Sequence, residues 1–133
     1  MKKLIYLANA YSSNLEDPDA AALQRSQRRQ LESFVGGKLK KRYGVTVLLP
    51  IAISAAMAEL CQFGTGFDEW KDDDLNFISR CDEVWVLTSD GWIESIGVQA
   101  EVKFALDNKI PIKYVNPITF DLNDEVIHWD MYI

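Results

Sequence analysis

The sequence is poor in the residues that hold metals and disulfide scaffolds. Among its 133 residues are two cysteines, Cys61 and Cys81, and a single histidine, His128. The cysteines lie apart in apolar stretches, so we expect free thiols in a reducing compartment. One imidazole and two distant thiols cannot supply a tetrahedral zinc site, and they offer no obvious Ser/His/Asp triad. We therefore expect no metal site.

Long apolar runs and an excess of positive charge are also missing. The first apolar run, Leu4 to Ala8, breaks at Asn9 and is too short for a signal-peptide core or a membrane span. Acidic residues outnumber basic ones by 20 to 14, and the net charge of -6 disfavours binding to the phosphates of a nucleic-acid duplex. The basic residues between Arg25 and Arg42 follow a helical pattern that indicates a solvated face. We expect a cytoplasmic protein that binds neither membranes nor duplexes.

The common glycine motifs for nucleotide phosphates do not occur. Neither GxGxxG nor GxxxxGK[ST] is present, and the nearest glycine pair, Gly64 and Gly66, does not directly follow a strand-like run. These absences argue against dinucleotide oxidoreductases and P-loop NTPases. No internal repeat or linker is visible, so we expect residues 1–133 to form a single domain.

What is present is an alternation of strand-like and helix-like segments. Continuous apolar runs predict buried strands, and amphipathic patterns predict helices. The predicted strands are Leu4–Ala8, Val45–Leu49, Glu83–Leu87 and Ile110–Val115, and the predicted helices run from Asp17 to Gly44, Phe67 to Ile78 and Ile96 to Leu106. The segment Ile51–Leu60 indicates a short helix or a loop. Two interpretations of VIHWDMYI at the C-terminus stay open, a final strand and a segment packed across the sheet. This order predicts an α/β protein, doubly wound in the flavodoxin or Rossmann manner, with a mainly parallel sheet flanked by helices.

Ligands of open parallel sheets bind at the carboxyl ends of the strands. The stretches 9–14, 50–53 and 88–95 follow the first three predicted strands. A binding site is therefore expected among them.

Two acids fall where apolar neighbours are expected. On a helical wheel Glu101 lies in the apolar arc of its helix, and Asp74 shares a face with apolar residues of the preceding helix. A carboxylate facing the core is costly unless it has a structural partner or a use. Two converging carboxyls suit glycosyl chemistry, in which one attacks the anomeric carbon and the other handles a proton. Tyr6 could supply a hydroxyl that keeps the nucleophile ionised, or it could be an ordinary core tyrosine.

From Leu4 to about Val115 the chain resembles the nucleoside 2-deoxyribosyltransferase superfamily. The segments that carry the resemblance are, in order, IYLANAY, DLNFISRCDEVWVL and SIGVQAEVKFAL. The segments PIA (50–52), CDEVWVL, DGW (90–92) and SIGVQAE are similar to a branch of small bacterial and phage proteins of uncharacterised function in that superfamily. The order and spacing of the segments carry the resemblance more than any one of them.

The resemblance implies cleavage or transfer at the N-glycosidic bond of a nucleoside or a nucleoside 5'-monophosphate. Glu101 matches the nucleophile that takes the sugar as a covalent glycosyl-enzyme. Asp74 matches the acid that exchanges a proton with the base, and Tyr6 matches the tyrosine that orients the glutamate. No metal or organic cofactor is implied, and a homo-oligomer is expected. The alternative is a non-catalytic nucleotide-binding or sensor domain.

The resemblance also implies residues that bind the substrate. Tyr11 falls where some members place an aromatic ring against the base. Ser95 stands where nucleotide N-hydrolases have a serine that reaches the 5'-phosphate, whereas nucleoside transferases commonly have an aspartate there. The loop after the first strand lacks the Gly-Ser and the arginine of those hydrolases, and Ser12, Ser13 or a backbone nest would have to replace them.

Four further positions complete the predicted binding set. Asp82 matches the family, although a turn-forming aspartate at a strand entrance needs no catalytic role. Trp92, like Trp70, could line the pocket or equally anchor the core. The others are Asn9, in the loop after the first strand, and Gly97, in the SIGVQAE segment.

Overall fold

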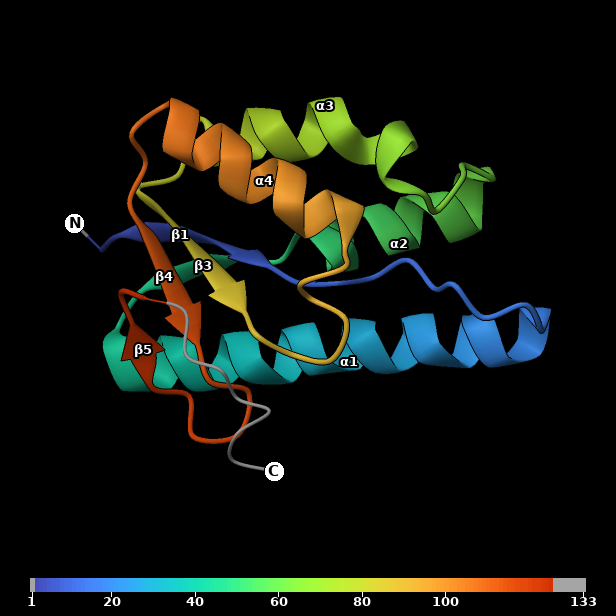
Figure 1. The fold of residues 1–133 in the computed structure, drawn as a ribbon, viewed down its shortest axis with the longest axis horizontal. Coiled ribbons are helices and arrows are strands. Elements are labelled where there is room, and N and C mark those ends of the chain that lie inside the picture. The colour runs from blue at the N-terminus through green and yellow to red at the C-terminus, as the bar shows by residue number, and fades with distance from the viewer. Residues whose placement is uncertain (1, 126–133) are drawn as a thin grey trace.

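The computed structural model describes residues 2–125 (Figure 1). Its elements are β1 (Leu4–Ala8), α1 (Pro18–Tyr43), β2 (Thr46–Leu48), α2 (Pro50–Cys61), α3 (Phe67–Ile78), β3 (Glu83–Leu87), α4 (Ile96–Asp107), β4 (Ile112–Val115) and β5 (Leu122–Asn123). The predicted alternation is confirmed, and the segment after β2 is a helix. The C-terminal VIHWDMYI, which includes His128, lies outside the described residues. Across residues 2–125, no helix combines the length and apolar character needed to cross a membrane.

The five strands form one sheet in the order β2-β1-β3-β4-β5. The first four are parallel, and β5 runs antiparallel to β4. The helix α1 lies along one face of the sheet, and α3 and α4 lie side by side over the other face (Figure 1). The fold is therefore α/β, doubly wound and mainly parallel, as the alternation predicts.

The alternation of side chains along β1 directs its residues to opposite layers. Ile5 and Leu7 pack with Val35 and Leu39 of α1. Tyr6 points to the other face, where it joins the cluster formed with α3 and α4. A tyrosine hydroxyl is thereby directed beneath α4.

The long helix α1 begins and ends at the residues that the sequence indicates. The Asp17 side chain accepts a hydrogen bond from the backbone amide of Ala20, and Gly44 ends the helix in the left-handed region with φ of 65°. Two apolar residues of α1, Leu23 and Phe34, are exposed, although an amphipathic pattern would bury them. Not every leucine and phenylalanine of α1 is buried, because only one side of the helix packs on the sheet.

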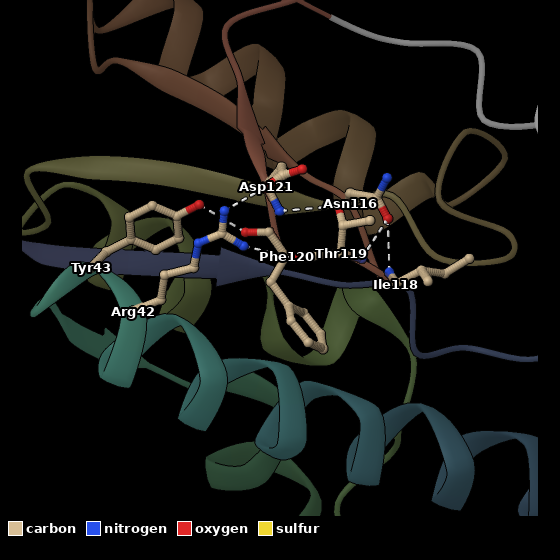
Figure 2. Close-up of polar contacts among 7 residues, drawn as sticks. All are labelled: Arg42, Tyr43, Asn116, Ile118, Thr119, Phe120 and Asp121. Carbon is tan, nitrogen blue, oxygen red and sulfur yellow. Dashed lines mark hydrogen bonds and ion pairs between the residues drawn. The ribbon is translucent and has the colours of Figure 1, made fainter.

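The two-residue strand β5 is not predicted from the sequence, and Figure 2 shows what holds it in place. The side chain of Asn116 accepts hydrogen bonds from two backbone amides of the turn that precedes β5. At the end of α1, Tyr43 donates to the carbonyl of Phe120, and Arg42 binds a turn carbonyl and the carboxylate of Asp121. Side-chain contacts to a distant helix, rather than a strand pattern, therefore fix this element.

Candidate active site

The carboxyl ends of β1 and β3 open into a cavity of about 680 Å³, within the range of small-molecule sites. The loop after β1, the first turn of α2 and the loop between β3 and α4 all line it. These are the three stretches that the sequence singles out. Residues of β1, α3 and α4 and two side chains of α1 also line it.

Glu101 faces this cavity from α4 and is only 5% exposed. Its neighbours Val98 and Ala105 are buried, while Gln99 and Lys103 are exposed, so the helical wheel is confirmed. The hydroxyl of the fully buried Tyr6 donates a hydrogen bond to the Glu101 carboxylate across 95 positions of sequence. Two of the three predicted catalytic residues are thus in direct contact.

Asp74 lines the same cavity from α3. It is half-buried and lies close enough to Tyr6 and Glu101 for its charge to act on both. The structure therefore brings all three predicted catalytic side chains to one cavity, from β1, α3 and α4. Their catalytic roles stay a prediction.

Burial and mutual repulsion keep protons on these groups. Burial raises the pKa of Glu101 to about 8, the Tyr6 hydroxyl opposes this rise, and the charge of Asp74 adds to it. Burial and the charge of Asp73 raise the pKa of Asp74 to about 7. Burial and the Glu101 charge raise the pKa of Tyr6 well above its usual value, so its hydroxyl remains a donor. Near neutral pH the pair Glu101 and Asp74 can therefore share a single proton, and it titrates as a unit.

Two predicted binding residues present side chains to the cavity. Tyr11 and Ser95 both line it. The Ser95 oxygen accepts a hydrogen bond from the backbone amide of Val98 at 3.2 Å and so caps α4. Its hydroxyl proton stays available to a ligand, because this contact uses only an acceptor lone pair.

Asn9 and Gly97 also line the cavity, but their contacts with neighbouring segments serve to keep the cavity wall in place. The Asn9 amide donates to the carbonyl of Arg28 at 3.0 Å, and its oxygen accepts from Ser89 at 2.8 Å. A Cβ at Gly97 would lie 3.1 Å from the ring of Phe67, so a larger residue would crowd the start of α3. These two positions shape the cavity more than they offer groups to a ligand.

The structure places Trp92 and Asp82 away from the cavity. The ring of Trp92 packs 5.9 Å from that of Tyr114 and against the core cluster. The Asp82 carboxylate accepts a hydrogen bond from the Leu4 amide at 2.7 Å, at the amino ends of β1 and β3. One side chain packs on the core and the other ties two strands together, and substrate binding by these residues stays a prediction. Trp70, by contrast, does line the cavity.

Sequence reasoning misses Arg28, which lies in the basic stretch predicted to be solvated. Its guanidinium lines the cavity and donates to the carbonyl of Ser12 at 2.5 Å. Gly91 packs against this guanidinium, since a Cβ there would lie 2.7 Å from Nη2, and its φ of 83° favours glycine. Within residues 2–125 Arg28 forms no ion pair. It brings a positive charge to a cavity whose other charged lining residues are all acidic.

Sequence reasoning also misses Glu32, which is fully buried on α1. A signal for it exists, because Glu32 stands at helical spacing from the buried residues Val35, Gly36 and Leu39. The surrounding charges mask this signal. Its carboxylate oxygens accept hydrogen bonds from two backbone amides at the start of α2.

The arrangement supplies a buried carboxyl, a second acid nearby and a hydroxyl that binds the first. Such a set can attack an electrophilic carbon and move a proton to a leaving group. Among residues 2–125 no cluster of His, Cys, Asp and Glu side chains is arranged to hold a metal ion.

Comparisons with known proteins place the chain in a family. A search of curated proteins finds no match. The family described as "Domain of unknown function (DUF1937)" matches residues 3–116, which include every residue that lines the cavity. The match covers most of the chain, and the protein therefore belongs to the DUF1937 family.

Proposed function

We propose that the protein cleaves, or transfers across, the N-glycosidic bond of a nucleoside or a nucleoside 5'-monophosphate. The observation that carries the proposal is the hydrogen bond from Tyr6 to Glu101 in a cavity that Asp74 also lines. The resemblance to the nucleoside 2-deoxyribosyltransferase superfamily supports it, since these are the three positions at which that superfamily has its nucleophile, orienting tyrosine and acid.

The first step forms a covalent intermediate. A carboxylate oxygen of Glu101 attacks C1' of the sugar, and the bond from C1' to the base nitrogen breaks. The electron pair leaves with the base, which takes a proton from Asp74. The product is a glycosyl ester on Glu101 and a free base.

The second step resolves this ester. Water or the nitrogen of a second base attacks C1', and the ester C–O bond returns its electrons to Glu101. The deprotonated Asp74 accepts the proton released by the attacking group. Solvent exclusion decides between hydrolysis and transfer.

The productive state of the free enzyme holds one proton on the pair, and that proton is on Asp74. This is the less populated arrangement, because the pKa of Glu101 is about 8 and that of Asp74 is about 7. The hydrogen bond from Tyr6 favours this arrangement, because it stabilises the ionised form of Glu101. Activity is therefore expected to follow a bell-shaped pH profile. Its two apparent pKa values describe the pair Glu101 and Asp74 together and are not assigned to either acid alone.

Arg28 favours the 5'-monophosphate among the substrates of this proposal. A guanidinium binds phosphate well, and this one brings to the cavity the positive charge that the loop after β1 lacks. The Ser95 hydroxyl would be a second donor to the phosphate. The proposal requires no cofactor, and it includes assembly into a homo-oligomer, which light scattering of the purified protein tests.

The test is a panel of nucleosides and 5'-monophosphates, with and without a second free base, analysed for released base. We expect release by the wild-type protein and none by Glu101→Gln. Trapping with a 2-deoxy-2-fluoro nucleoside, in which fluorine slows the second step, should add one sugar to the protein mass. Tight binding without release across the panel would contradict the enzyme and favour the sensor alternative.

A further inference from the structure

The helix α2 lacks an N-cap of its own, and a residue of α1 supplies the missing acceptors. The N-cap position is Leu49, which has no side-chain acceptor, and Pro50 has no amide hydrogen. The next two amides, of Ile51 and Ala52, donate to the two oxygens of Glu32 at 2.9 and 3.1 Å. A carboxylate at this place also meets the positive end of the helix dipole.

The close approach of the α1 backbone lets Glu32 reach α2. One turn beyond Glu32 stands Gly36, and a Cβ there would lie 2.7 Å from the side chain of Leu49. Both residues lie on the same face of α1 because they are four positions apart. The glycine therefore leaves room on this face of α1 for the side chain of Leu49, the residue before α2.

The first turn of α2 is also a wall of the cavity. Pro50, Ile51 and Ser54 line it directly. The Glu32 carboxylate thus holds, through two backbone amides, a segment that a ligand in the cavity would touch.

The charge of Glu32 acts on the acids inside the cavity. Glu32, Tyr6, Asp74 and Glu101 come from α1, β1, α3 and α4 and interact electrostatically, while α2 contributes only its amides. Burial raises the pKa of Glu32 to about 7; the two amides and Arg29 oppose the rise, and Asp74 adds to it. The charge of Glu32 in turn raises the pKa of Glu101.

We propose that Glu32 is a positioning residue of the site: its buried carboxylate fixes the α2 wall of the cavity by binding two backbone amides, and its charge acts on Glu101. The kinetic consequence rests on the proposed function. The electrostatic consequence does not, because it concerns the ligand-free protein.

The test is a carbon-detected NMR titration of the Glu101 carboxyl in the wild-type protein and three variants. Glu32→Gln removes the charge and should lower the apparent pKa of Glu101 by roughly 0.5–1 unit. Glu32→Asp keeps the charge but shortens the side chain, so it should speed amide exchange at Ile51 and Ala52 and move the Glu101 titration much less. Glu59→Gln removes an exposed charge from α2 and should change neither.

An unchanged Glu101 titration in a folded Glu32→Gln protein would overturn the proposal. If that variant fails to fold, the titration of Glu32 in the wild-type protein is the deciding measurement. Glu32 is then expected to titrate near neutral pH in steps shared with Glu101, and a single step near the ordinary value of 4.5 would overturn the idea.

Kinetics separate this inference from the proposed function. If the wild-type protein releases base, Glu32→Gln should move its pH optimum to lower pH, because Glu101 ionises more readily. Base release with identical pH profiles in both proteins would refute the role of Glu32 alone. Absence of release from every nucleoside and nucleotide would refute the proposed function, and the NMR titration would still decide the electrostatic role.

Discussion

Two of the buried glutamates, Glu83 and Glu101, have opposite surroundings. Glu83 begins β3 and is 4% exposed, and Glu101 in the cavity is 5% exposed. Glu83 meets Lys3 at 2.5 Å and Lys113 at 3.8 Å, and it accepts from the indole of Trp85 at 2.9 Å. Burial alone would raise its pKa, but these donors and cations hold the pKa of Glu83 below its usual value. Glu83 is therefore an ionised structural group.

Glu101 has no cation among the groups that act on its charge. It has one tyrosine hydroxyl and two further acids nearby, and its pKa is raised to about 8. The exposed fractions of the two side chains are nearly equal, but Glu101 lies deeper in the protein, and the groups around it differ from those around Glu83. A buried carboxyl indicates a reactive site only where no cation pairs with it. Without such a partner its pKa is raised, so the group can gain or lose a proton during a reaction.

The largest effect expected from this contrast is on activity. Glu101→Gln should lower the rate of base release by at least about 10³-fold, since it removes the nucleophile. Glu83→Gln should leave the rate near that of the wild type and cost about 1.5–3 kcal/mol of stability at pH 7 through its lost charged hydrogen bonds. Base release and urea unfolding of both variants provide the measurement. Equal activity of the two variants would remove the distinction between the sites.

The same contrast predicts opposite effects of pH on stability. The pKa of Glu101 is raised on folding from 4.5 to about 8, so the stability linked to this group is full below 4.5 and is lost as the pH rises through 8. Each pKa unit corresponds to about 1.4 kcal/mol. Glu101→Gln should therefore be more stable than the wild type at pH 8.5, by up to several kcal/mol.

Glu83 provides the matched control for this experiment. Its pKa is lowered on folding, so its stabilisation is present above the unfolded value and is lost in acid. Glu83→Gln should be destabilised at pH 7, and the difference should shrink below pH 4. Urea unfolding across the pH range measures both variants, and parallel curves would contradict the assignment.

Tyr6→Phe tests the one hydrogen bond that favours ionised Glu101. Its loss should raise the pKa of Glu101 further, because that bond lowers it. We expect base release at pH 7 to fall about 10- to 100-fold and the pH optimum to move upward. A uniform loss at all pH values, with an unshifted optimum, would point to a packing role for Tyr6 instead.

Arg28→Ala should have the smallest effect, because in the proposal it removes a contact to the phosphate and leaves the reacting groups in place. The KM for 5'-monophosphates should rise about tenfold, while that for the matching nucleosides stays near the wild-type value. Lys40→Ala, an exposed substitution on the same helix, is the control. An equal change for both substrate classes would argue against phosphate recognition.

Local pattern predicts most of this fold. The bounds of α3 and β3 agree with the sequence prediction, and Asp17 and Gly44 mark the ends of α1. Glu101 is found because hydrophobic periodicity is a local property, and a charge in an apolar arc stands out against it. The short strand β5 is not found, because contacts with α1 hold it rather than its own residues.

The sequence by itself determined the strands and helices, the order in which they alternate and the apolar arc that contains an acid. These properties depend on neighbours within a few turns of the chain. Only the tertiary structure decided which buried acid contacts a lysine and which contacts a tyrosine and lies near other acids. It also decided that Glu32 of α1 is buried and that Arg28 of α1 lines the cavity. Electrostatic interactions depend on distance in space, and the partners that set the ionisation of Glu83 and Glu101 lie as many as 80 and 95 positions away in the chain.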